Sequence, residues 1–106
     1  MSRILGIDYG DRRIGLALSD PLQIIAKPLT VIDRKYILDY FSAIEKIVID
    51  MKIISIVVGI PMNMKGEKSI QTNKTIKFIK LLEANLNIPI IGIDERLSSL
   101  TAEKLF

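Results

Sequence analysis

Residues 3–17 read RILGIDYGDRRIGLA, and this stretch decides the fold of the chain. Its first half predicts a buried strand over Arg3–Tyr9, and apolar residues alternate with small ones in a second predicted strand over 14–19. The Gly10-Asp11 dipeptide between them is typical of a hairpin turn. The sequence therefore predicts an antiparallel hairpin at the start of the domain.

Outward from this hairpin, the pattern predicts alternating helices and strands. A third strand is expected over 26–32, and a nearly continuous β-branched run over Ile53–Ile60 is typical of a central parallel strand covered on both faces. A fifth strand is expected over 88–93. Asp33 is a plausible N-cap for a first helix, whose expected apolar face consists of Ile37, Phe41, Ile44, Val48 and Met51.

A second helix is expected over 72–86, and a third is expected to begin after Ser98 or Ser99. The resulting order, βββ-α-β-α-β-α, predicts an α/β fold with a mixed five-stranded sheet and helices on both faces. The length of 106 residues is that of one domain.

Composition restricts the chemistry that the chain can perform. It has no cysteine and no histidine, which excludes disulfide frameworks, zinc knuckles and serine–histidine triads. Catalysis or metal binding must therefore depend on Asp and Glu. The net charge of +3 is compatible with a phosphate-rich partner, although many ordinary enzymes share it. No apolar stretch resembles a signal peptide or a membrane span, so we expect a cytoplasmic protein without a membrane partner.

Carboxylates follow two of the predicted strands at the point where each strand ends. Asp8 ends the first strand, and Asp94 and Glu95 follow the fifth. If these strands run parallel with Ile53–Ile60 between them, their carboxyl ends meet at one edge of the sheet. Alternatively, Asp8 only opens the turn, and Asp94 or Glu95 caps the last helix or pairs with Arg96. Convergence favours a site, and carboxylates without histidine suit Mg²⁺ or Mn²⁺.

Several basic residues are candidates for contacts with phosphate groups. Arg96 can hold a phosphate oxygen, and residues 59–66 form a candidate substrate loop that contains Lys65. A row of lysines on the second helix can follow a nucleic-acid backbone. A solvated helix face is the better explanation of this row when it is taken alone. The row consists of Lys74, Lys77 and Lys80.

Three blocks of sequence resemble the YqgF/RuvX-like family, whose members are described as Holliday junction resolvases and pre-16S rRNA nucleases. The first is LGIDYG over residues 5–10, followed by RIGLA over 13–17 and Ser19-Asp20. The second is VVGIP over 57–61 with Asn63, Met64 and Gly66, and the third is DERLSS over 94–99 with Ala102 and Glu103. The blocks occur in order and cover essentially the whole chain.

The resemblance implies an RNase H-like fold and a metal-dependent phosphodiesterase that trims the 5′ end of precursor 16S rRNA. It implies that Asp8 and Glu95 are catalytic acids and metal ligands, and we add Asp94 as a further ligand. Substrate contacts are predicted at Gly10, Arg13, Asn63, Lys65 and Arg96. The expected partners are precursor 16S rRNA or branched DNA, and the protein is expected to be a monomer or a homodimer.

Family members normally continue into a further helix that carries another aspartate, so we expect this chain to be C-terminally truncated or a reduced member. The alternative function is therefore a catalytically impaired module that binds RNA or ribosome precursors. A fragment of a sugar-kinase or actin-like ATPase would also begin with a strand ending in Asp-x-Gly, but such enzymes need two domains around a nucleotide.

Overall fold

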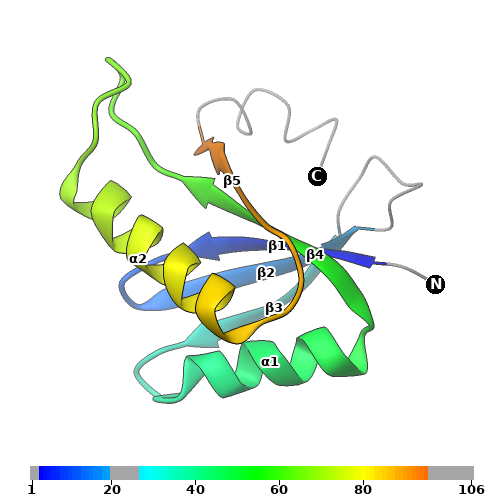
Figure 1. Cartoon of the computed structure of the whole chain (residues 1–106). Helices are drawn as coiled ribbons and strands as arrows, with labels where there is room; N and C mark the ends of the chain where they lie inside the picture. Colours follow the sequence, from blue (N-terminus) through cyan, green and yellow to red (C-terminus); the bar gives the residue numbers. More distant parts are fainter. Residues whose placement is uncertain (1–2, 20–26, 96–106) are drawn as a thin grey trace.

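The computed structural model describes residues 3–19 and 27–95, which form a five-stranded sheet and two helices (Figure 1). The strands occur in the spatial order β3-β2-β1-β4-β5. Their bounds are β1 Arg3–Tyr9, β2 Arg13–Ser19, β3 Lys27–Asp33, β4 Ile53–Ile60 and β5 Ile90–Asp94. The helices are α1, Tyr40–Asp50, and α2, Ile70–Asn85. Neither helix combines the length and the apolar character that a membrane crossing requires.

The sheet is mixed, as the sequence predicts. β1 pairs with β2 and β2 with β3 in antiparallel fashion, whereas β4 runs parallel to both β1 and β5. The β2–β3 register shifts between Leu16 and Ala17, close to Pro28 near the start of the outer strand β3. Because β1, β4 and β5 are parallel, their carboxyl ends share one edge of the sheet.

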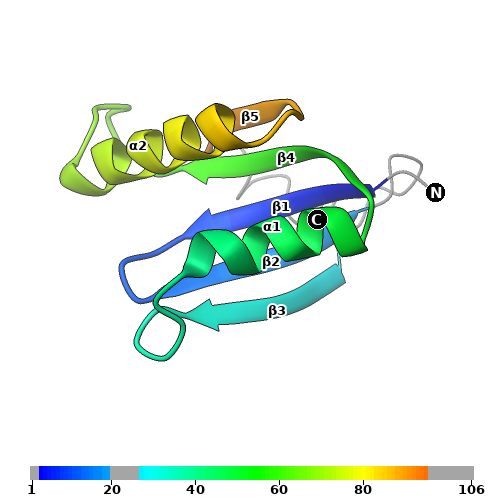
Figure 2. The same ribbon diagram turned by 60° about the horizontal axis from the view of Figure 1, so that its bottom comes forward.

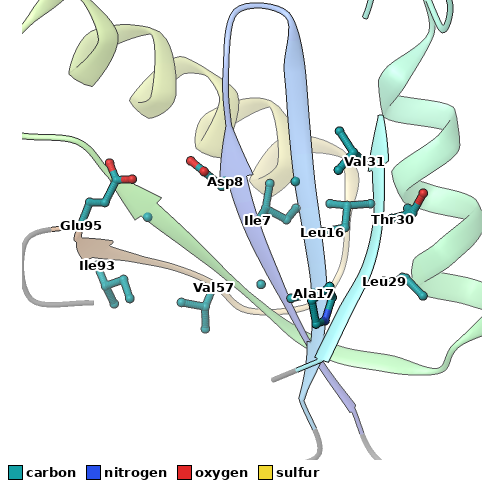
Figure 3. A pocket seen from close by; sticks show the side chains of 14 residues that line it. Ile7, Asp8, Leu16, Ala17, Leu29, Thr30, Val31, Val57, Ile93 and Glu95 are labelled. Carbon is teal, nitrogen blue, oxygen red and sulfur yellow. The ribbon is translucent and has the colours of Figure 1, made fainter. Parts of the chain in front are cut away.

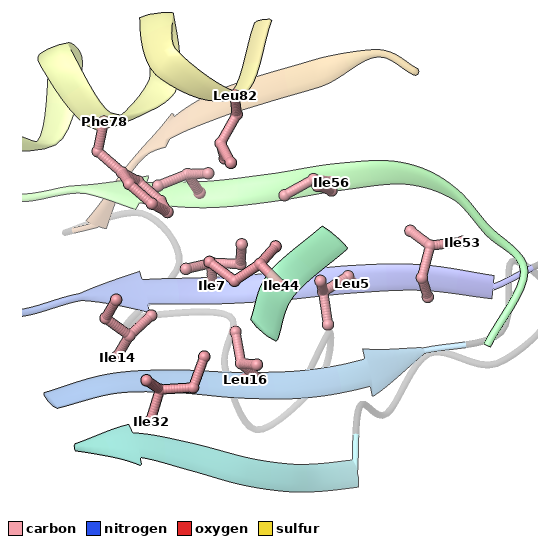
Figure 4. Close-up of a cluster of buried hydrophobic side chains, with 11 residues drawn as sticks. Leu5, Ile7, Ile14, Leu16, Ile32, Ile44, Ile53, Ile56, Phe78 and Leu82 are labelled. Atoms are coloured by element: carbon pink, nitrogen blue, oxygen red, sulfur yellow. The ribbon is translucent and has the colours of Figure 1, made fainter. Parts of the chain in front are cut away.

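Both described helices cover the same face of the sheet (Figure 2). Ile44 of α1 and Phe78 and Leu82 of α2 pack onto one set of strand residues (Figure 4). Each buried apolar side chain of this kind stabilises the fold by about 1.5–3 kcal/mol. The buried core consists of Leu5, Ile7, Ile14, Leu16, Ile32, Ile44, Ile53, Ile56, Val58, Phe78 and Leu82.

The opposite face carries none of the described helices. Alternation along the strands places Gly6 and Asp8 of β1 on it, together with Gly15 of β2 and Val57 and Gly59 of β4. The helix predicted to follow Ser98 or Ser99, and Asp20 of the first family block, lie outside the described residues.

The first helix begins six residues later than predicted. Its N-cap is Asp39, whose carboxylate accepts a hydrogen bond from the Ser42 amide at 3.1 Å. The prediction of Asp33 as the N-cap is therefore wrong. The Asp33 backbone carbonyl instead accepts hydrogen bonds from the amides of Tyr36 and Ile37, which close a turn directly after β3. Ile37 consequently lies outside the helix and is exposed.

The second helix begins two residues earlier than predicted, because Ser69 forms a capping box with Thr72. The Ser69 hydroxyl accepts from the Thr72 amide, and the Thr72 hydroxyl accepts from the Ser69 amide. This reciprocal pair satisfies two amides that a helix start would otherwise leave without partners.

Candidate active site

A pocket of about 510 Å³ opens on the face of the sheet that lacks the described helices (Figure 3). Its walls are mainly apolar, and among the described residues that line it only Asp8 and Glu95 are charged. All five strands contribute to the lining or lead into it. The lining residues are Gly6, Ile7, Asp8, Gly15, Leu16, Ala17, Pro28, Leu29, Thr30, Val31, Val57, Gly59, Ile93 and Glu95.

Asp8 lies on β1 and Glu95 directly follows β5, and these two strands are not neighbours because β4 lies between them. Figure 3 shows their carboxylates on either side of the end of β4. Gly59, near that end, pairs with Ile93 of β5. The β1–β4 register pairs Ile7 with Val58, so Gly59 also follows beside Asp8. The sheet edge thus brings together the two carboxylates predicted from the strand ends.

Glycines keep the space around the two carboxylates open. A Cβ atom on Gly59 would lie 3.8 Å from Cγ of Glu95, and one on Gly15 would lie 3.8 Å from Cβ of Asp8. These are ordinary contact distances, so a side chain at either position would occupy space next to a carboxylate. A ligand can therefore approach the backbone at this point of the sheet.

The two acidic groups influence each other electrostatically. Partial burial raises the pKa of Glu95, and the negative charge of Asp8 raises it further. Each effect penalises the ionised form of Glu95, and a nearby cation would relieve both.

Asp94 does not share this pocket. It is the last residue of β5, where it pairs with Ile60, and it follows the pocket residue Ile93. Successive strand residues point to opposite faces, so Asp94 belongs to the face that carries the helices. Within residues 3–19 and 27–95, no three acidic side chains are grouped closely enough to hold a metal ion.

Gly10 lies in the hairpin turn and Arg13 begins β2 directly after it, and both are outside the pocket lining. The Gly10 amide donates to the Arg13 carbonyl oxygen at 3.0 Å, and a Cβ on Gly10 would lie only 2.6 Å from that oxygen. The turn itself therefore requires glycine at this position. The Arg13 side chain is exposed, with Nε 4.0 Å from an Asp33 carboxylate oxygen.

Asn63 and Lys65 lie in the loop between β4 and α2, also outside the pocket lining. The Asn63 side-chain oxygen accepts hydrogen bonds from the amides of Lys65 at 2.9 Å and Glu67 at 2.8 Å. Asn63 thus shapes the loop, and Lys65 is exposed on it.

In the lysine row on the second helix, Lys74 forms an ion pair with Asp11 at 3.0 Å. Arg96 lies outside the described residues.

Two residues that the sequence analysis missed hold the backbone directly after Asp8. A guanidinium nitrogen of Arg34 donates to the Gly10 carbonyl oxygen at 3.1 Å, and Nε2 of Gln71 donates to the Tyr9 carbonyl oxygen, also at 3.1 Å. Arg34 also lies 5.2 Å from the ring centroid of Tyr9 and 5.0 Å from that of Tyr40. A local sequence pattern cannot predict these contacts, because the paired residues are 24 and 62 positions apart in the chain.

Comparison with known proteins agrees with this architecture and places the chain in a family. The structure of T. thermophilus RuvC in complex with a Holliday junction substrate superposes with a TM-score of 0.64 at 12% identity, over 99% of this chain and 74% of that one. This likeness confirms the RNase H-like fold.

Two sequence relatives carry the name "Putative pre-16S rRNA nuclease". The one from Dictyoglomus thermophilum is 39% identical over 103 residues, which are 97% of this chain and 74% of the relative. The one from Caldanaerobacter subterraneus is 44% identical over 102 residues, which are 96% of this chain and 73% of the relative. The RuvX family model, described as Holliday junction resolvase, matches residues 2–106. The chain therefore belongs to the RuvX family.

Proposed function

We propose that this chain is a nuclease that hydrolyses a phosphodiester bond in the 5′ region of precursor 16S rRNA, with Mg²⁺ or Mn²⁺ held by Asp8 and Glu95. The observation that carries the proposal is the convergence of these two carboxylates in one pocket at the carboxyl edge of the sheet, Asp8 from β1 and Glu95 from the position directly after the non-adjacent strand β5. The relatives' names supply the class of substrate. Such a substrate is found in the cytoplasm, where we expect the protein to act.

The donor set in the pocket fits a hard divalent cation. Asp8 and Glu95 offer carboxylate oxygens, and the chain contains no histidine or cysteine that would favour zinc. The raised pKa of Glu95 reflects burial beside a second negative charge, which a cation would offset. Magnesium is commonly held by one or two carboxylates together with substrate phosphates. When bound, it would activate water and neutralise charge on the leaving oxygen.

The chain's own residues prepare the pocket for a phosphate group. Strand β4 pairs with β1 on one side and with β5 on the other, which fixes the backbone around the site, and Gly15 and Gly59 leave space beside the carboxylates. The apolar walls, including Val57 and Ile93, lower the local dielectric constant and strengthen the interactions of Asp8 and Glu95 with a cation. Positioning and electrostatic stabilisation of this kind account for most catalysis of phosphoryl transfer.

Cleavage of a defined RNA tests the proposal. A labelled RNA that contains the 5′ extension of 16S rRNA is incubated with the protein in Mg²⁺, in Mn²⁺ or in EDTA. We expect cleavage only with a divalent cation, and its loss in Asp8→Asn and in Glu95→Gln. The matched control variants, Asp50→Asn and Glu83→Gln, remove exposed charges on the helices and should cut like the wild type. Equal cutting by all variants would point to a contaminating nuclease and would overturn the proposal.

A non-catalytic role is the second candidate, and one observation favours it: the pocket brings together two carboxylates rather than three among the residues of 3–19 and 27–95. In that case the protein binds the precursor RNA and does not cut it. Binding without cleavage under every metal condition would select this function. A parallel incubation with a four-way DNA junction determines whether RNA or branched DNA is the substrate.

A further inference from the structure

We propose that a basic cleft beside the β1–β2 turn binds the backbone of a single-stranded segment of the nucleic acid. The cleft has a volume of about 400 Å³ and is called the turn cleft below. It is separate from the carboxylate pocket and shares no lining residue with it. The choice of nucleic acid as the partner rests on the proposed function. The turn cleft is lined by Asp11, Arg12, Arg34, Lys35 and Leu38.

The positive charge of the protein is concentrated around this cleft. Five cationic side chains gather here against two carboxylates, those of Asp11 and Asp33, which leaves a surplus of three positive charges. The whole chain also has a net charge of +3, so the charges elsewhere cancel. The five cations are Arg12, Arg13, Arg34, Lys35 and Lys74. A local excess of this kind attracts the phosphates of a nucleic acid.

Two of these arginines pair with Asp33 while their own side chains remain accessible. Asp33 lies between them, with its carboxylate oxygens 3.6 Å from Nε of Arg12 and 4.0 Å from Nε of Arg13. The Asp33 side chain is 25% exposed, whereas those of Arg12 and Arg13 are 57% and 66% exposed. A guanidinium carries five N–H donors, so each arginine retains donors for a phosphate after it pairs with Asp33.

An exposed aromatic ring next to the turn cleft points to a nucleic acid rather than to an acidic peptide. Tyr36 is 73% exposed, and Nζ of Lys35 lies 5.5 Å from its ring centroid. Leu38, which lines the cleft, is 86% exposed. Aromatic rings beside cations provide platforms on which unpaired bases stack. The exposed ring therefore favours a single-stranded nucleic acid, whose unpaired bases can stack on it.

The turn cleft and the carboxylate pocket are close enough to contact the same strand. Arg12 follows Asp8 by four residues, so their Cα atoms are separated by at most about 14 Å. Both sites lie at the end of the sheet where β1 terminates. A single strand that enters the turn cleft can therefore continue to Asp8.

Equilibrium binding of a labelled single-stranded RNA, measured by fluorescence anisotropy in EDTA, tests the cleft without cleavage. We expect Arg12→Gln combined with Lys35→Gln to weaken binding at least tenfold at low salt. The dependence of log K on log salt should become shallower by about one for each phosphate that the variant no longer neutralises. Tyr36→Ala should weaken binding by roughly tenfold, and Tyr36→Phe should restore it.

The matched control carries Lys46→Gln and Lys52→Gln, which remove the same charge from the second half of α1 and from the turn before β4. It should bind RNA within about twofold of the wild type, and all variants should keep the wild-type melting temperature. Equal losses in the cleft variant and in the control would overturn the proposal, as would competition by polyglutamate as effective as that by unlabelled RNA. Binding is measured in EDTA, which prevents cleavage, so the two proposals can fail separately. If the protein binds RNA through the turn cleft but never cuts it in Mg²⁺ or Mn²⁺, only the nuclease proposal is contradicted. If the protein cuts RNA and the cleft variants bind it as tightly as the wild type, only the proposed role of the turn cleft is contradicted.

Discussion

Arg34 donates a hydrogen bond to the Gly10 carbonyl oxygen at 3.1 Å, and this contact fixes the backbone two residues beyond Asp8. The same guanidinium lies over the rings of Tyr9 and Tyr40, and Tyr9 in turn stacks on Phe78 at a centroid distance of 4.2 Å. A residue that follows β3 is thereby connected to the end of β1 and to both helices. The position of Asp8 thus depends on contacts made far from it in the sequence.

Replacement of Arg34 should reduce cleavage more than it reduces substrate binding. Arg34→Lys keeps the charge but removes the planar group that contacts both rings and Gly10. We expect kcat to fall roughly tenfold or more, because small displacements of reacting groups are costly. The stability loss should be about 1–2 kcal/mol. Steady-state kinetics at several RNA concentrations measures the change, and a rise in KM with unchanged kcat would contradict this positioning role.

Gly59→Ala should separate activity from stability. The added methyl group meets Glu95 at an ordinary contact distance of 3.8 Å, so the strand accepts it without a clash. Alanine within a strand is also about 0.5–1 kcal/mol more favourable than glycine. We therefore expect an unchanged or higher melting temperature together with a loss of cleavage of roughly tenfold or more, because the methyl group fills space beside the carboxylate. Full activity would show that substrate does not approach the backbone here.

Glu95→Gln should stabilise the metal-free protein at neutral pH. The pKa of Glu95 is raised in the folded state, so the folded protein retains a proton that the unfolded chain releases from about pH 4.3 upward. Stability is therefore lost as the pH rises through this range, and glutamine avoids the loss. The gain should be about 1 kcal/mol or less, since the group is partly exposed.

Urea unfolding in EDTA at pH 3.5 and pH 7 measures this difference. The variant and the wild type should differ in stability at pH 7 and converge at the lower pH. In the Asp8→Asn background the gain should shrink, because the Asp8 charge contributes to the raised pKa. A variant that is less stable than the wild type at pH 7 would contradict the direction of the shift.

Asp39→Ala should show the opposite dependence on pH. Hydrogen bonds from the Ser42 hydroxyl and amide lower the pKa of Asp39 in the folded state. The stabilisation by this N-cap is therefore present above the ordinary pKa of the group and is lost as the pH falls through the lowered one. Thermal unfolding should show a lower melting temperature for the variant at pH 7 and a smaller difference at pH 2–3. Asp33→Ala, at the N-cap position suggested by the sequence, should leave the capping of helix α1 unchanged.

The sequence predicts the strands better than the start of the first helix. The bounds of β1 and β4 agree with the prediction, because residues typical of turns or of the surface bound these apolar stretches: Gly10 follows β1, Lys52 precedes β4 and Pro61 follows it. Asp33 and Asp39 are both suitable N-cap residues, and Ile37 fits the apolar face of a longer helix. Tertiary pairs decide between them: Asp33 is engaged by Arg12 and Arg13, which only folding brings near.

The candidate site was predictable as far as strand order allows. The rule that parallel strands end at a common edge brings Asp8 and Glu95 together, and the structure agrees. This rule cannot decide whether Glu95 or Asp94 enters the pocket, because that depends on where β5 ends and on which face of the sheet each side chain lies. The roles of Arg34 and Gln71 were not predictable. Their partners are backbone carbonyl groups, which every residue has, so the sequence does not indicate these contacts.

The outer strand β3 has a consequence for the behaviour of the protein at high concentration. An edge strand exposes unpaired backbone groups, onto which another chain can add and begin aggregation. Lys27, Pro28 and the nearby register shift interrupt this edge, because proline offers no amide and a lysine charge repels a second copy. Val31 is exposed farther along the same strand, where neither a charge nor a proline protects the edge, so a second chain would add most easily there.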